Sequence, residues 1–103
     1  MKTLVITAMS AALLAMAAPT FANQTLAQQN GCMSCHGVDR KMVGPAFKDI
    51  AKKYAGQPNA VTNLMAKVRT GSRGVWGQVP MPPSPQVKDE DNRRIIEWVL
   101  SLK

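Results

Sequence analysis

Residues 32–36 read Cys-Met-Ser-Cys-His, and they constrain the fold of this chain more than any other segment. Two cysteines three positions apart, followed at once by histidine, form the C-x-x-C-H pattern of c-type haem attachment. The two thiols can form thioethers with the vinyl groups of one haem, and His36 can then give an imidazole nitrogen to the iron. The 103-residue chain has two cysteines and one histidine, and this segment uses all three. We therefore expect one covalently bound haem c, with Cys32 and Cys35 as its attachment points.

Three other uses of this segment are less favoured. A thioredoxin-like dithiol needs a βαβ context, and no strand-rich segment flanks the motif. A zinc site needs four ligands, and the chain has no further cysteine or histidine. A disulfide between Cys32 and Cys35 would close a very short loop and constrain the chain little. Of these alternatives, the redox dithiol is the strongest. The colour of the protein and a titration of free thiols would distinguish it from a haem protein.

The first 22 residues have the organisation of a secretory signal peptide. Lys2 gives a positive start, residues 4–18 are largely apolar, and residues 20–22 supply small side chains for a cleavage site. A membrane anchor is the alternative, but polar residues and a proline interrupt the apolar run, which is short for a span. We expect cleavage after Ala22, a periplasmic location, and a single domain over residues 23–103.

Hydrophobic spacing predicts an all-α chain of about four helices. The expected helices span residues 23–30, 47–54, 59–70 and 89–102. Asn23 or Thr25 is expected to cap the first helix. Asn59 and Asp89 are expected to cap the third and the last. Three glycines and four prolines between residues 71 and 87 predict one long irregular loop.

A domain of this size lies near the lower limit at which a protein core suffices alone. The chain has only five aromatic residues, so a large buried haem would be the centre of the core. A cofactor that binds only the folded state stabilises it. Removing the haem is therefore expected to unfold the chain.

Met81 is the expected second axial ligand, on the face of the iron opposite His36. With no second histidine, a methionine thioether is the natural candidate, and it raises the reduction potential. Met33 lies inside the haem attachment segment. Met42 follows His36 too closely in sequence to reach the opposite face of the iron. Met65 belongs to the apolar face of a helix, where packing is the usual role, and is the second choice. Met81 stands among prolines that stiffen the backbone and can hold its side chain over the iron.

The charge is strongly positive, with 13 lysines and arginines against six acids and a net charge of +7. Most cations lie between Arg40 and Arg73, whereas four acids lie between Asp89 and Glu97. No nucleic-acid recognition motif accompanies this charge, so we expect no nucleic-acid partner. A protein partner with an acidic docking face, or an anionic membrane surface, is favoured instead.

The chain resembles the class I c-type cytochromes, specifically the small bacterial cytochrome c-551/c-552 type. The matching segments are GCMSCH at 31–36, KMVGPAF at 41–47, GVWG at 74–77, VPMPP at 79–83 and WVLS at 98–101. The resemblance spans nearly the whole mature chain. It implies a helical domain wrapped around one haem, and a monomeric electron carrier rather than an enzyme.

The resemblance also implies roles for individual residues. Cys32 and Cys35 would be the thioether cysteines, and His36 and Met81 the axial ligands. The carbonyl of Pro45 would accept from the other ring nitrogen of His36. Trp76 would donate its indole N–H to a haem propionate, whereas Trp98 is expected to pack in the core. One departure is Ser84, which stands where relatives commonly carry an amide that hydrogen-bonds the methionine sulfur.

The partners implied are periplasmic or membrane-bound redox proteins, such as a nitrite reductase, a terminal oxidase, a peroxidase or a quinol-oxidising complex. The alternative function is that of a haem protein with an open distal site, which binds a small gas or peroxide. That alternative requires that Met81 not bind the iron.

Overall fold

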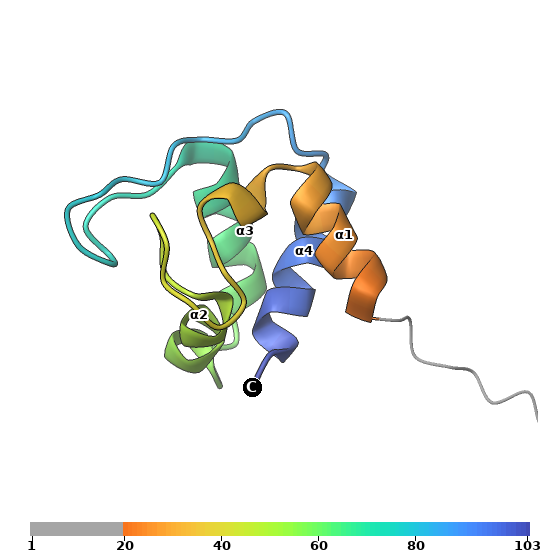
Figure 1. The fold of residues 1–103 in the computed structure, drawn as a ribbon, viewed down its shortest axis with the longest axis horizontal. Helices are drawn as coiled ribbons and strands as arrows, with labels where there is room; N and C mark the ends of the chain where they lie inside the picture. The colour runs from red at the N-terminus through yellow and green to blue at the C-terminus, as the bar shows by residue number, and fades with distance from the viewer. Residues whose placement is uncertain (1–19) are drawn as a thin grey trace, which may run out of the picture.

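The computed structural model describes residues 20–103, which contain four α-helices and one 3-10 helix (Figure 1). They are α1 (Thr20–Gln29), η1 (Cys32–Ser34), α2 (Phe47–Tyr54), α3 (Ala60–Thr70) and α4 (Asp89–Ser101). The strand-like pairings in this part of the chain are two isolated bridges, His36 with Lys41 and Ser72 with Met81. The all-α fold expected from hydrophobic spacing is therefore confirmed.

Helix α1 begins earlier than the sequence predicts. It starts at Thr20, so Asn23 and Thr25, the expected caps, lie inside the helix. Neither glycine nor proline occurs between Thr20 and Gln29, so nothing in the sequence stops the helix from extending toward the N-terminus. Residues 1–19 of the expected signal peptide lie outside the described residues. Among the described residues, no helix combines the length and apolar character needed to cross a membrane.

Helix α2 is fixed to the segment that follows His36. Its buried residues recur at helical spacing: Phe47, Ala51 and Tyr54. Ala46, its N-cap, has no side chain that can accept a hydrogen bond. The free amide of Phe47 donates instead to the carbonyl of Gly37 at 2.8 Å. The next amide, of Lys48, donates to the carbonyl of Val38 at 3.1 Å, so main-chain oxygens cap this helix.

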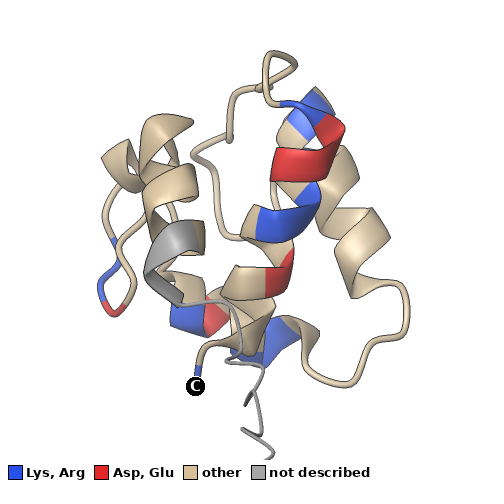
Figure 2. Ribbon diagram, turned by 90° about the vertical axis from the view of Figure 1, so that its right-hand side faces the viewer, with Lys and Arg blue, Asp and Glu red and all other residues tan. Residues whose placement is uncertain are grey.

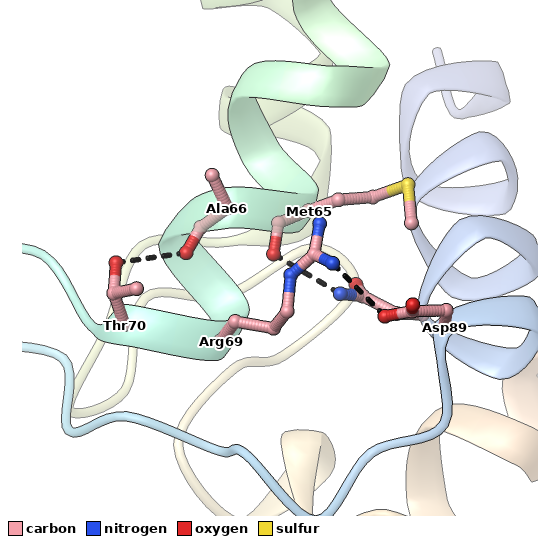
Figure 3. A network of polar contacts seen from close by, with 6 residues as sticks. Met65, Ala66, Arg69, Thr70 and Asp89 are labelled. Atoms are coloured by element: carbon pink, nitrogen blue, oxygen red, sulfur yellow. Dashed lines mark hydrogen bonds and ion pairs between the residues drawn. The ribbon is translucent and has the colours of Figure 1, made fainter.

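Helices α3 and α4 are joined near the start of α4 (Figure 3). The guanidinium of Arg69 lies 2.9 Å from the carboxylate of Asp89, but this exposed pair is worth at most about 1 kcal/mol. Asn92, which is 1% exposed, donates to the carbonyl of Met65 at 3.0 Å. Its own Oδ1 is buried without a partner among the described atoms, which costs about 1–3 kcal/mol. These polar contacts set the register of the two helices, and apolar packing supplies most of the stability.

The expected caps of α3 and α4 are only partly right. Asn59 is the N-cap of α3, as predicted, but its side chain makes no capping hydrogen bond. The N-cap of α4 is Lys88, one residue before the predicted Asp89. The carboxylate of Asp89 pairs with Arg69 instead. It still favours the helix from the first turn, because a negative charge there interacts with the positive end of the helix dipole.

The core consists of two groups of buried side chains that meet on α4. The first group is Ala27, Phe47, Val87, Ile95, Trp98 and Val99, and the second is Tyr54, Ala60, Leu64, Met65 and Ile96. Partly buried Ile50 and Val68 pack against both groups. Helices α1, α2 and α3 each make their main helix–helix contact with α4. The expected burial of Met65 and Trp98 is confirmed.

Residues 71–87 form the long irregular connection between α3 and α4, as the glycines and prolines predict. Ser72 and Met81 join its two limbs, because their main chains exchange hydrogen bonds of 3.1 and 2.9 Å. Gly71 ends α3 with φ 80°, a conformation that favours glycine. A Cβ at Gly71 would lie 2.6 Å from the carbonyl oxygen of Met81. Main-chain contacts therefore fix the backbone of Met81 against the end of α3.

The surface charges fall into paired and unpaired sets. Along α4 both signs occur in turn (Figure 2). Arg94 pairs with Glu90 at 2.7 Å. Arg93 also lies 3.9 Å from Glu97. The ion pairs between described residues leave these cations of the middle of the chain unpaired: Arg40, Lys41, Lys52, Lys53, Lys67 and Arg73. The uncompensated positive charge therefore lies before α4.

Candidate functional site

An apolar cavity lies between the C-x-x-C-H segment, the 71–87 loop and helices α2, α3 and α4. Its volume is about 120 Å³. Its wall includes every residue that the sequence singles out for haem binding: Cys32, Cys35, His36, Pro45, Trp76 and Met81. The structure thus brings together all six predicted site residues from four segments of the chain.

Cys32 and Cys35 are free, half-buried thiols on the wall of this cavity. The turn of η1 holds them, because the amides of Cys35 and His36 both donate to the carbonyl of Cys32, at 3.2 and 3.0 Å. Burial raises the pKa of the Cys32 thiol; a backbone hydrogen bond offsets part of this rise and the neighbouring Cys35 adds to it. Reactive dithiols commonly have a lowered pKa, and the direction of the pKa shift at Cys32 is the opposite.

His36 is buried, at 8% exposed, and Pro45 holds its ring. The Nδ1 atom lies 2.7 Å from the carbonyl oxygen of Pro45. A carbonyl can only accept, so Nδ1 donates this hydrogen bond, and in the neutral ring the lone pair lies on Nε2. Such a bond orients the ring and makes it a better donor to a metal. Gly44 lies against the same ring, and a Cβ there would be 2.6 Å from Cε1.

A second support of His36 was not apparent from the sequence. The ring of Phe47 stacks on the imidazole, with centroids 5.1 Å apart and an interplanar angle of 19°. Trp98 in turn meets Phe47 edge-on, at 5.4 Å and 74°. Helical spacing predicts that Phe47 points inward, but not which ring it meets. Its position two residues after Pro45 is the signal that could have found it, because Pro45 brings the start of α2 next to the imidazole.

Among the four methionines of the described residues, only Met81 lines the cavity. Met65 is buried in the second core group, as expected of a packing residue. Met33 packs against the first core group, and Met42 is half exposed. The structure therefore brings one thioether to the cavity, and it is the one that the sequence predicts.

Trp76 lies on the cavity wall with 40% of its surface exposed. Its place in the loop leaves the indole N–H without a hydrogen-bonding side chain or carbonyl among the described residues. The ammonium of Lys53 lies 5.3 Å from the centre of its ring. Lys67, unlike Lys53, lies on the cavity wall itself. Trp98, by contrast, is buried in the core and away from the mouth, as expected.

Ser84 is the residue at which the sequence departs from the pattern that it resembles, where an amide side chain is expected. Its main-chain N–H donates to the carbonyl of Val68 near the end of α3, at 2.7 Å. Ser84 does not line the cavity, and its hydroxyl makes no hydrogen bond with the described residues. Its structural contribution is therefore to the backbone of the loop, three residues after Met81 of the bridge.

The residues on the wall fit a covalently attached haem c. Two free thiols lie on one turn, an imidazole presents a nitrogen lone pair, and a thioether lines the same space. The remaining wall is mainly apolar, as the porphyrin faces require: Val43, Phe47, Ile50, Tyr54, Leu64, Val68, Val75, Val79, Ile95, Ile96 and Val99. Lys67 lies on the same wall and would offer a positive charge to an acidic substituent of the haem.

The sequence of this chain is similar to those of known cytochromes. The family model described as cytochrome c matches residues 22–103. Cytochrome c-552 of Hydrogenobacter thermophilus is 50% identical over 92 residues, which are 89% of this chain and 93% of that protein. Cytochrome c-552 of Nitrosomonas europaea is 47% identical over 103 residues and the full length of both chains. Cytochrome c-551 of Pseudomonas aeruginosa is 48% identical over 80 residues, 78% of this chain and 76% of that protein.

Solved structures agree with these relatives. The crystal structure of wild-type Nitrosomonas europaea cytochrome c552 superposes with a TM-score of 0.76 and 51% identity, covering 78% of this chain and 99% of the other. A class 1 cytochrome from Sideroxydans lithotrophicus superposes with a TM-score of 0.68 and 29% identity, covering 84% and 98%. Fold, cavity and sequence therefore lead to one conclusion: the chain belongs to the cytochrome c family, as a small class I c-type cytochrome that carries electrons on one covalently bound haem c.

Proposed function

We propose that this protein shuttles single electrons between periplasmic redox partners, at a haem with His36 and Met81 as its axial ligands. One observation carries the proposal. Of the methionines in the described residues, Met81 alone lines the cavity that His36 also lines. When bound, the haem supplies an iron that alternates between the ferric and ferrous states. The protein supplies attachment, ligands and a largely water-free setting.

Each residue of the wall has a distinct part in this proposal. The thiols of Cys32 and Cys35 would each add across one vinyl group, with the S–H bond and the C=C π bond replaced by an S–C and a C–H bond. Nε2 of His36 donates to the iron, because Nδ1–H is already engaged by Pro45. The thioether of Met81 donates from the other face and raises the reduction potential.

A coordination sphere completed by two side chains suits electron transfer rather than substrate chemistry. The backbone bridge between Ser72 and Met81 supports this reading, because it holds the methionine in place independently of the iron. The stack of Phe47 on His36 restrains the other ligand. With both ligands restrained, little of the structure has to move when the charge on the iron changes. Trp76 is proposed to donate its indole N–H to a haem propionate at the cavity mouth.

The location and partners follow from the sequence features already described. Residues 1–22 are proposed to direct export and to be removed, which leaves a monomeric domain of residues 23–103 in the periplasm. The partners are proposed to be periplasmic or membrane-bound redox proteins with acidic docking faces. Unpaired cations near the cavity, Lys53 and Lys67, support this choice. Such complexes bury little surface and are short-lived.

The variant Met81→Ala tests the ligand set. We expect the wild-type holoprotein to have low-spin spectra in both oxidation states and a weak near-infrared sulfur–iron band in the ferric state. Met81→Ala is expected to lose that band completely, to become high-spin when reduced, and to bind carbon monoxide rapidly. The absorption spectra of both oxidation states provide the measurement.

The matched control is Met42→Ala, because Met42 is half exposed and lies off the cavity wall. Its spectra should equal those of the wild type. A wild-type protein with no sulfur band and fast carbon monoxide binding would contradict His36/Met81 ligation. The open-site haem protein would then be the better description.

Electrostatic guidance predicts opposite salt effects for oxidants of opposite charge. Oxidation of the ferrous protein by ferricyanide should slow as salt rises from about 10 mM to about 0.5 M, whereas oxidation by a tripositive cobalt phenanthroline complex should accelerate. The reason is that the positive net charge of the chain attracts the anion and repels the cation. We expect changes of about tenfold, measured by stopped flow. Rates flat in ionic strength for both oxidants would remove the argument for acidic docking faces.

A further inference from the structure

The tip of the 71–87 loop is held by few polar contacts. The bridge of Ser72 with Met81 closes the base of this loop. Beyond the bridge, residues 73–80 make no hydrogen bond to other described residues through either main chain or side chain. Gly74 and Gly77 both have positive φ and open space around them, so the backbone itself does not stiffen the tip. Whatever keeps the tip on the cavity must act through its side chains.

Lys53 is the charged side chain that reaches the tip from another element. It lies in the last turn of α2, and its Nζ stands 5.3 Å from the centre of the Trp76 ring. That distance is within the range of roughly 6 Å for attraction between an ammonium and the face of an indole. Trp76 also lines the cavity, so one ring is in contact with the cavity and with Lys53.

The rest of α2 is rigidly placed, which makes Lys53 a fixed anchor point. Tyr54, the next residue, is 6% exposed and belongs to the second core group. The first turn of the same helix is bonded to Gly37 and Val38. A cation on this helix can therefore restrain the loop, whereas a cation on a mobile segment could not.

We propose that Lys53 is a positioning residue that latches the tip of the ligand loop to α2 through the face of Trp76. It acts on the iron site only through Trp76 and the loop that carries Met81. The inference rests on the proposed function, since the loop matters to the iron only if Met81 is a ligand. It adds a residue of α2 to the machinery that keeps the methionine side of the site closed.

The latch predicts a measurable change in loop opening. Loss of an exposed contact of this kind raises the population of the open loop about two- to fivefold. Two rates report on that population in the ferric holoprotein. One is hydrogen exchange of the Trp76 indole N–H by NMR, and the other is the rate at which added imidazole displaces the Met81 sulfur, followed by the loss of the near-infrared band.

Three variants separate the latch from a general effect of charge. Lys53→Met keeps the apolar stem and removes the cation, and it should raise both rates about two- to fivefold. Lys53→Arg keeps a cation that can stack on the indole and should stay near the wild type. Lys52→Met removes the neighbouring exposed cation, which lies over no aromatic ring of the described residues, and should change neither rate.

The inference is supported if Lys53→Met alone accelerates both rates. It is overturned if the two rates are no higher in Lys53→Met than in Lys52→Met. It is also overturned if both rates are as high in Lys53→Arg as in Lys53→Met. Failure of the proposed function gives a different result. In that case the wild-type ferric protein has no sulfur–iron band at the outset, while the indole exchange of the variants still reports on the latch.

Discussion

Without its haem, the chain is expected to be unfolded at room temperature. The double variant Cys32→Ala/Cys35→Ala cannot form the two thioethers, and its far-UV circular dichroism should show most of the helix signal lost, with no cooperative thermal transition. Both core groups contribute side chains to the cavity wall: Phe47, Ile95 and Val99 from the first, and Tyr54, Leu64 and Ile96 from the second. An unfilled cavity therefore loosens both halves of the core at once.

The folding stability that is lost with the haem is expected to exceed the total stability of so small a domain. The apolar faces of a haem bury surface against these six side chains, at about 25 cal/mol per Å² of apolar area removed from water, and this contribution is lost with the cofactor. The whole stability of a typical domain is only about 5–15 kcal/mol. The polar contacts between α3 and α4 contribute too little to compensate.

The control is the same double variant with free haem added. Haem that binds through the cavity without thioethers should restore helix, because a ligand that binds only the folded state shifts the equilibrium toward it. Recovery would show that the two alanines are not themselves the cause of unfolding. A haem-free chain with native helix content and a sharp melting transition would contradict the prediction.

Gly44→Ala is expected to damage the histidine side of the site. The new Cβ would stand 2.6 Å from Cε1 and 2.9 Å from Nδ1 of His36, distances that no unstrained methyl group adopts. The ring cannot simply move away, because Pro45 holds Nδ1 and Phe47 stacks against it. Overpacking of this kind costs about 1–3 kcal/mol. For a domain of this size that lowers Tm by roughly 5–20 °C.

The cause of this loss can be separated from backbone strain. Gly44 is not among the glycines with positive φ, so alanine is acceptable to its backbone and the collision is the source of the cost. Gly56→Ala provides the converse control, since Gly56 has φ 75° and open space around it. It should lower Tm through backbone strain and leave the hyperfine-shifted NMR signals of the ferric haem unchanged. Gly44→Ala should shift those signals, and unchanged signals would mean that the imidazole is not displaced.

The helices were predictable because their signals are local. The spacing of Phe47, Ala51 and Tyr54 predicts α2 with the bounds that the structure shows. The glycines and prolines of residues 71–87 likewise predict an irregular loop. The six candidate residues were also predictable, through the C-x-x-C-H motif and the family resemblance, and they do line one cavity. Their roles toward the haem stay predictions.

What the sequence did not reveal depends on partners that are distant along the chain. The amides at the start of α2 use main-chain oxygens of Gly37 and Val38, which no side-chain pattern encodes. Asp89 prefers the guanidinium of Arg69, twenty residues earlier, to a capping role. The bridge between Ser72 and Met81 joins two backbones without any alternation of polar and apolar residues. Each of these contacts is specified by the tertiary fold rather than by its own segment.

The central position of α4 has a consequence for the order in which this protein is made. Helices α1, α2 and α3 make their main contacts with α4, the last helix to leave the ribosome. Until that segment emerges, the earlier helices have no surface on which to assemble, and helices of such length are marginal alone in water. Cys32, Cys35 and His36 are synthesised more than fifty residues before Trp98. They therefore stay accessible until the haem is attached, which agrees with a haem-free chain that is expected to be unfolded.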